Sequence, residues 1–244
     1  MKTAPLEKLQ SRLGYYFRNG ELLRQALRHP SFISDSGIRG DHNQRLEFLG
    51  DALLGAILAE RLYHEFPQHR EGQLSRNRSI LARGHFLACL ARDLGLPECL
   101  ELGVGENNTG GRQRESNLED ALEALVGAIY LDSDWDNVRG VVLHWYGNIA
   151  SRLETQLAEE NPKGRLQELV QSELGNDVML YTLKEVTGPD HLKQFAIALS
   201  IGGEVLGNGR GNSKKEAEEN AAREALVHWL NKPKAQIPQP EQES

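Results

Sequence analysis

The stretch NQRLEFLGDALLGAIL, residues 43–58, has apolar residues at the spacing of an α-helix, with two acids in the middle of it. Glu47 and Asp51 are four residues apart, so on a helix they project from one face, one turn apart. Like charges at that spacing repel each other unless water reaches both or a positive group lies between them. The stretch therefore predicts a packed helix that carries either a solvated acidic stripe or a cation-binding pair.

A second segment, ESNLEDALEALVGAIYLD at residues 115–132, has the same character. Asp120 and Glu123 are three residues apart, again on one face of an otherwise apolar helix. Small residues would let the two helices approach closely, and we expect this of Gly55, Ala56, Gly127 and Ala128. Carboxylates from two facing helices would form an all-oxygen cluster, the ligand set that Mg²⁺ and Mn²⁺ prefer. The predicted metal ligands are Glu47, Asp51, Asp120 and Glu123.

Each acidic pair also has an ordinary interpretation. Ser116 and Glu119 fit a capping box, and acids in a first helical turn, Asp120 included, complement the helix dipole. Glu47 and Asp51 could be a solvated stripe. Both interpretations lose weight because the two pairs occur together, each inside its own most apolar helix.

The fold class predicted from the whole chain is mainly α. Helical spacing of apolar residues dominates residues 1–156 and indicates an all-α domain, with an exposed Gly-rich loop at 103–113. Residues 157–161 are expected to be a linker. The Pro- and Gln-rich tail, 232–244, has too little apolar surface to pack, so we expect it to be disordered.

The period of the apolar residues changes in the C-terminal part, and the order there is typical of a small α-β-β-β-α domain spanning residues 162–231. Alternating apolar and polar residues predict strands between two helical segments. The predicted elements are a helix at 162–174, strands at 178–187, 192–201 and about 204–211, and a helix at 213–230.

Charge and cysteine content restrict the function classes. The chain of 244 residues has 28 basic and 35 acidic residues, a net charge of −7, which by itself argues against a polyanionic partner. Residues 162–231 hold eight basic and ten acidic residues, so any nucleic-acid binding must come from the arrangement of charges. Cys89 and Cys99 form no CxxC or Cys/His pattern, which favours neither a disulfide framework nor a zinc site. With no long apolar run, we expect a soluble, cytoplasmic, non-secreted protein without membrane contact.

The stretch NQRLEFLGDALLG resembles the signature of the ribonuclease III family, commonly written N-E-R-L-E-F-L-G-D-[SA], and residues 115–132 are similar to the family's second acidic helix. The resemblance runs from about residue 6 to residue 230. It implies a homodimeric helical endonuclease domain followed by a double-stranded RNA-binding domain. The implied activity is metal-dependent hydrolysis of duplex RNA to 5′-phosphate and 3′-hydroxyl ends with short 3′ overhangs, in the processing of ribosomal, messenger and transfer RNA.

The same resemblance assigns roles to individual residues. Glu47, Asp51, Asp120 and Glu123 would hold catalytic Mg²⁺, for which Mn²⁺ can substitute, with Asp51 and Glu123 as the catalytic pair and no organic cofactor. Glu71 matches a further acid associated with the site. Phe48 would pack into the partner subunit, although a place in its own core fits the sequence equally well. Gln44 stands where the family usually has Glu, and a neutral amide cannot contribute the same charge.

The C-terminal segment GRGNSKKEAEENAA places two lysines at a predicted helix N-terminus, where backbone N–H groups and the helix dipole favour phosphate. An ordinary alternative pairs these lysines with Glu218 and Glu219 one turn later. The stretch resembles the double-stranded RNA-binding motif, which reads A-form shape more than sequence. By that resemblance the RNA-binding residues are Gln167, Glu168, Gln171, Pro189, His191, Ser213, Lys214 and Lys215.

Two functions from different classes follow. The first is a Mg²⁺-dependent endoribonuclease specific for duplex RNA. The second is a non-catalytic, dimeric protein that binds double-stranded RNA and keeps the helical domain only for dimerisation. Because all four core acids are present, the sequence favours the enzyme.

Overall fold

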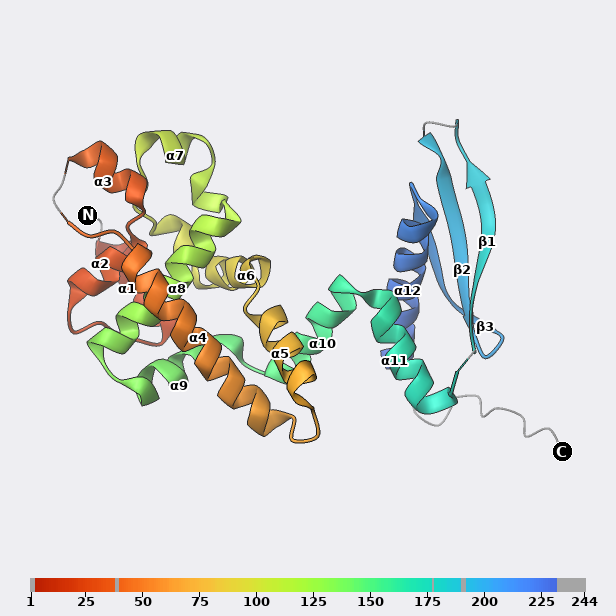
Figure 1. Cartoon of the computed structure of the whole chain (residues 1–244). Coiled ribbons are helices and arrows are strands. Elements are labelled where there is room, and N and C mark those ends of the chain that lie inside the picture. Colours follow the sequence, from red (N-terminus) through yellow and green to blue (C-terminus); the bar gives the residue numbers. More distant parts are fainter. Residues whose placement is uncertain (1–2, 38–39, 177, 190–191, 232–244) are drawn as a thin grey trace. The chain divides into compact units, whose positions relative to one another are not determined.

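The computed structural model describes residues 3–37, 40–176, 178–189 and 192–231. The chain forms two compact units, Met1–Leu153 and Glu154–Ser244, and the elements of each are labelled in Figure 1. His191 and the tail at 232–244, for which RNA contact and disorder were expected, lie outside the described residues. In the ranges described, no helix is both long and apolar enough to cross a membrane.

The N-terminal unit is all-α, which confirms the prediction. Its longest helices, α4 and α8, carry the two acidic pairs. Short 3₁₀ turns at Leu96–Glu98 and Gly111–Gln113 complete the unit. The α-helices are α1 (Thr3–Leu13), α2 (Gly20–Leu27), α3 (Pro30–Ser36), α4 (Gln44–Glu65), α5 (Glu71–Leu81), α6 (Gly84–Leu94), α7 (Val104–Asn108), α8 (Glu115–Asp132), α9 (Trp135–Tyr146) and α10 (Ile149–Glu160).

The Gly-rich segment at 103–113 differs from the expected loop, because α7 and a 3₁₀ turn lie within it. Its folding follows from Glu106, which pairs with Arg114 and accepts a hydrogen bond from the Asn117 amide (2.7 Å). The same amide donates to the Gly111 carbonyl oxygen (2.9 Å). These contacts tie the segment to the start of α8.

Helix α8 forms the centre of the N-terminal unit and contacts α2, α4, α6 and α9. All of its residues from 121 to 129 are buried, so it has no solvated face over more than two turns. Glycines bring α4 and α8 together: a Cβ on Gly50 would overlap the Glu123 carbonyl oxygen, and one on Gly127 would overlap that of Leu46. The prediction for Gly55 was wrong, since a Cβ there would meet no atom within 4 Å.

The C-terminal unit has the predicted α-β-β-β-α order. Antiparallel pairing joins β1 to β2 and β2 to β3, with Leu183 opposite Ile197 and Ala198 opposite Asn208. Leu166 of the first helix and Trp229 of the last lie in the core on the sheet. The elements are α11 (Pro162–Leu174), β1 (Met179–Thr187), β2 (Gln194–Ile201), β3 (Glu204–Gly211) and α12 (Lys214–Asn231).

The division between the two units falls after Leu153, inside α10, three residues before the boundary expected from the sequence. Most of the segment expected as a linker is the last turn of that helix. Ala158 packs against the C-terminal core, and Arg165 of α11 donates to Glu154 (2.5 and 3.0 Å). These contacts place the second half of α10 with the C-terminal unit.

Candidate active site and nucleic-acid interface

The crossing of α4 and α8 brings the four predicted acids into one electrostatic cluster. Glu47 is half-buried on α4, and its pKa is raised, first by burial and then by the charges of Asp120, Glu119 and Asp51. Two of these charges come from the other helix. The predicted pairs therefore act on each other, as expected from their placement on facing helices.

Glu123 is the most buried member of this acidic cluster, with 8% of its surface exposed. Burial is the largest cause that raises its pKa, to about 8, and the charges of four neighbouring acids raise it further. Burial likewise raises the pKa of Asp120. At neutral pH the Glu123 carboxyl therefore keeps its proton unless a positive charge compensates it. The four neighbouring acids are Asp51, Glu119, Glu47 and Asp120.

No basic side chain in the described ranges forms an ion pair with any acid of this cluster. The donor atoms are carboxylate oxygens only, which fits a hard divalent cation. Across these same ranges, His, Cys, Asp and Glu side chains do not already converge as a group of three or more around a metal position.

Glu119 is a fifth member of the cluster that the sequence analysis did not assign to the site. The expected capping box is wrong: α8 begins at Glu115, its N-cap is Arg114, and no side chain caps it. Burial raises the pKa of Glu119, as do the charges of Asp120 and Asp51. Its position four residues before Glu123 was the available signal, because that spacing places both acids on one face.

Glu71 and Gln44 lie at the edges of this arrangement. Glu71 is the exposed first residue of α5 and accepts a hydrogen bond from the Ser75 hydroxyl (2.9 Å). Its charge is not among those that raise the pKa of Glu123. Gln44 is the exposed first residue of α4. The structure thus brings together the four core acids and Glu119, but not Glu71.

An open hollow adjoins the cluster between α4 and α5. Asp51 lies at its border, and Arg78 and Ser79 of α5 form part of its wall. Small side chains line the rest, so a backbone of sugar and phosphate could lie beside the acids. These small residues are Ala52, Gly55, Ala56 and Ala82.

Phe48 has 81% of its surface exposed, so its alternative place in the core of its own chain is wrong. It lies one residue beyond Glu47, on a different face of α4. In the described parts of the chain, Phe48 is the most exposed of the large apolar residues.

The two lysines at the start of α12 differ in their surroundings. Lys215 lies 3.9 Å from Glu219, while Glu218 pairs with Lys163 of α11 (2.5 Å). Lys214 has no ion-pair partner in the described portions of the chain. The alternative in which both lysines are paired one turn ahead therefore holds for Lys215 alone. Ser213 accepts a hydrogen bond from the Glu216 backbone N–H (3.1 Å) and so orders this helix start.

The remaining predicted RNA contacts lie on α11 and before β2. Gln167 and Gln171 are exposed and four residues apart, so they share one face of the helix. Glu168 is also exposed and pairs with Arg165 (3.2 Å). Pro189 is exposed in the connection between β1 and β2.

Comparison with known proteins agrees with both units. Residues 19–149 match the family described as ribonuclease-III-like, and residues 162–228 match the double-stranded RNA binding motif. The chain is 43% identical over 229 residues to ribonuclease 3 of Vibrio vulnificus strain YJ016, covering 93% of this chain and 99% of that protein. It is 44% identical to ribonuclease 3 of Proteus mirabilis strain HI4320, with 93% and 98% covered.

Solved structures agree as well. The crystal structure of the nuclease domain of ribonuclease III from Campylobacter jejuni is similar with a TM-score of 0.55 at 38% identity, covering 62% of this chain and 97% of that one. A second structure of that domain, described as flexible in a region involved in dimer formation, gives 0.54 at 38% identity, with 57% and 94% covered. This chain belongs to the ribonuclease III family and is an endoribonuclease that acts on double-stranded RNA.

Proposed function

We propose that Glu47, Asp51, Asp120 and Glu123 form the hydrolytic site and bind Mg²⁺, with Mn²⁺ able to substitute. The observation that carries this proposal is the set of carboxylates gathered around buried Glu123, for which the described residues provide no ion-pair partner. A divalent ion supplies the missing positive charge, and oxygen ligands suit it. Glu119 adds negative charge to the same site.

The roles that we propose for the site residues follow from how deeply each one is buried. Held by these carboxylates, Mg²⁺ would supply a nucleophilic water at neutral pH and would neutralise charge at the departing 3′ oxygen. The raised pKa of Glu123 keeps this carboxyl protonated in the metal-free protein, so binding of a cation would require release of that proton. Asp51 lines the open hollow, and we place the scissile phosphate there. Attack of water on the phosphorus atom breaks the bond between phosphorus and the 3′ oxygen. The products therefore carry 5′-phosphate and 3′-hydroxyl ends.

We further propose a homodimer with Phe48 in its interface. Cutting both strands of a duplex needs two related sites, which a twofold axis supplies, and offset cuts leave short 3′ overhangs. The exposure of Phe48 supports this role. We expect Phe48→Ala to weaken the dimer about tenfold or more in sedimentation equilibrium, because buried aromatic residues are frequent hot spots. Tyr16→Ala, another exposed aromatic residue, is the control and should leave the dimer intact.

The C-terminal unit positions the duplex through three regions. Gln167, Glu168 and Gln171 are assigned to one minor groove, Pro189 and His191 to the next, and Ser213, Lys214 and Lys215 to the phosphates between them. Structured transcripts, including precursors of ribosomal, transfer and messenger RNA, are the proposed substrates. Two free cysteines suit a reducing compartment, so we place this activity in the cytoplasm.

Cleavage of an end-labelled RNA duplex, with and without Mg²⁺, tests the site. We expect Glu123→Gln to lower the rate by about 10³-fold or more while duplex binding persists, since catalytic groups act as a unit. Glu71→Gln, outside the cluster, should retain most of the rate. Binding without cutting by the unmodified protein at every Mg²⁺ and Mn²⁺ concentration would instead support the non-catalytic alternative.

A further inference from the structure

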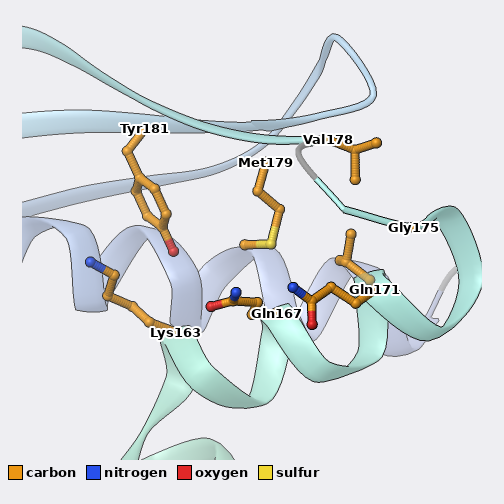
Figure 2. Close-up of a pocket in the computed structure, with 8 residues that line it drawn as sticks. Lys163, Gln167, Gln171, Gly175, Val178, Met179 and Tyr181 are labelled. Carbon is orange, nitrogen blue, oxygen red and sulfur yellow. The ribbon is translucent and has the colours of Figure 1, made fainter.

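A small pocket lies between α11 and β1 in the C-terminal unit (Figure 2). Its volume is about 200 Å³. Figure 2 shows Met179 and Tyr181 pointing from β1 toward α11, because alternate residues of a strand share one face. Apolar and polar side chains both line the pocket. The apolar and aromatic ones are Val170, Val178, Met179 and Tyr181. The polar ones are Lys163, Gln167 and Gln171, and Gly175 completes the lining.

The Tyr181 hydroxyl is the unusual group in this pocket. It is buried and has no hydrogen-bond partner in the described part of the chain, which costs free energy. Burial and the nearby Glu218 charge raise the pKa of Tyr181 to about 12, so the hydroxyl keeps its proton and can donate. The Lys163 ammonium lies 4.7 Å from the centre of the ring and 2.5 Å from Glu218. This lysine lies over the tyrosine ring and lines the pocket beside it.

Size and chemistry restrict what the pocket can hold. Pockets for drug-sized molecules have volumes of roughly 300–1,000 Å³, so this one fits a single ring-sized group. Its apolar side chains suit the face of a flat ring. Each glutamine amide offers two N–H donors and one carbonyl acceptor, and Tyr181 adds a donor, which suits a ring with polar edges. The lysine adds a positive charge for a neighbouring anion.

We propose that this pocket binds one unpaired nucleobase of the RNA substrate, so that the C-terminal unit detects a bulge or loop beside the duplex. The inference rests on the proposed function, in which Gln167 and Gln171 contact the duplex. A base within the duplex is stacked and its pairing edge is occupied, whereas an unpaired base can turn out and stack on side chains. The base that enters is thus attached to the RNA that α11 already touches.

Each pocket residue then has a defined part. Met179 and Val178 contact the face of the base, and the two glutamine amides bond its edge in place of the minor groove that they contact in a perfect duplex. Lys163 shifts from the tyrosine ring toward the adjoining phosphate, which uncovers the Tyr181 hydroxyl for an acceptor on the base. The side chain of Lys163 is 35% exposed, so it has room to move.

Methyl NMR on the full-length protein gives a direct test, because the chain has two methionines, Met1 and Met179. A sample carrying ¹³C-methyl methionine, without divalent metal so that RNA stays uncut, is titrated with a perfect duplex and with the same duplex carrying a one-nucleotide bulge. Loss of a signal in Met179→Leu assigns the resonance. We expect the Met179 signal to move upfield with the bulged duplex only. Equal movement with both duplexes, or with neither, would overturn the proposal.

Binding measurements separate this proposal from the proposed function. We expect the unmodified protein to bind the bulged duplex about tenfold more tightly, which is the effect of stacking one base. Tyr181→Phe removes one hydroxyl group and should reduce the preference for the bulged duplex to about threefold or less. Its affinity for the perfect duplex should not change. Tyr16→Phe, the control, should keep the full preference. A preference that persists in Tyr181→Phe contradicts the pocket. Loss of binding and cleavage of the perfect duplex in the unmodified protein would instead contradict the proposed function.

Discussion

Two contacts in the molecule are packed in the same way but differ in charge. They are the crossing of α4 with α8 and the contact of β3 with α12. At each, a glycine touches a backbone: Gly50 meets the Glu123 carbonyl, and Gly209 meets that of Ala217. In the described residues, none of the five acids at the α4–α8 crossing has an ion-pair partner, although the nearby His29 lowers the pKa of Asp120. On α12, in contrast, each acid has a hydrogen-bonding or ionic partner, as Glu218 has in Lys163. Close packing alone therefore does not bring unpaired charges together, and the unpaired acids distinguish the α4–α8 crossing from the β3–α12 contact.

We expect the largest effect from Gly50→Ala, which tests whether α4 and α8 are tightly packed where they cross. The added methyl group would overlap the Glu123 carbonyl, so α4 and α8 must separate, and we expect a loss of about 3 kcal/mol in the free energy of unfolding. Denaturant unfolding measures it.

Gly55→Ala is the matched control on the same helix, because a Cβ there meets no atom within 4 Å. Replacing this helical glycine should stabilise the protein by roughly 0.5–1 kcal/mol. Equal effects of the two substitutions would show that the crossing is not tightly packed.

The unpaired acids at the α4–α8 crossing lead to a second prediction. Glu123→Gln should stabilise the metal-free protein at high pH. The folded-state pKa of Glu123 is raised to about 8 from 4.5, so the folded protein holds a proton that the unfolded chain has released. The stabilising contribution is complete below pH 4.5 and disappears as pH rises through about 8. At pH 8.5 the glutamine variant should gain at least about 1 kcal/mol, or about 2–4 °C in Tm.

Thermal unfolding with a chelator at pH 5 and pH 8.5 checks this prediction. The advantage of Glu123→Gln should be smaller at pH 5 than at pH 8.5. Glu71→Gln, which removes an exposed acid outside the cluster, should change Tm little at either pH. An advantage that does not depend on pH would contradict a buried, protonated Glu123.

The smallest effect concerns α12, where pairing reduces the available charge. Lys214 has no ionic partner in the described residues, whereas Lys215 lies 3.9 Å from Glu219. We expect Lys214→Ala to reduce the slope of log affinity against log salt for duplex RNA by about 1, and Lys215→Ala to reduce it less. Fluorescence anisotropy at several salt concentrations measures both slopes, and a larger change for Lys215→Ala would reverse this ranking.

Sequence reasoning predicted the periodic parts of the molecule well. The all-α unit, the order of the C-terminal elements and the helix at Pro162–Leu174 follow from local patterns of apolar residues and helix-breaking residues. The four acids on α4 and α8 followed from the spacing of carboxylates on helices, which is also a local property. The exposure of Phe48 could not be settled, because an aromatic residue suits a core and an interface equally well.

Other features depend on how two distant segments meet. Which glycine of α4 lies at the crossing depends on the rotation of the helix, and Gly50 rather than Gly55 lies there. Glu119 is available to the cluster because α8 begins two residues earlier than a capping box at Ser116 would require. The pocket at Tyr181 forms only when β1 lies against α11, so no pattern in either segment alone predicts it.

The glycine contacts at the α4–α8 crossing are reciprocal. Gly50 meets Glu123 and Gly127 of α8, while Gly127 meets Leu46 and Gly50 of α4. Replacing one glycine would widen the crossing and thereby relieve the strain that a second replacement causes, so the cost of changing both should be less than the sum. The interhelical distance also sets how far Glu47 lies from Asp120. In the proposed metal site, substitution at either glycine would therefore change the spacing of the carboxylates and with it the size of the ion that fits between them.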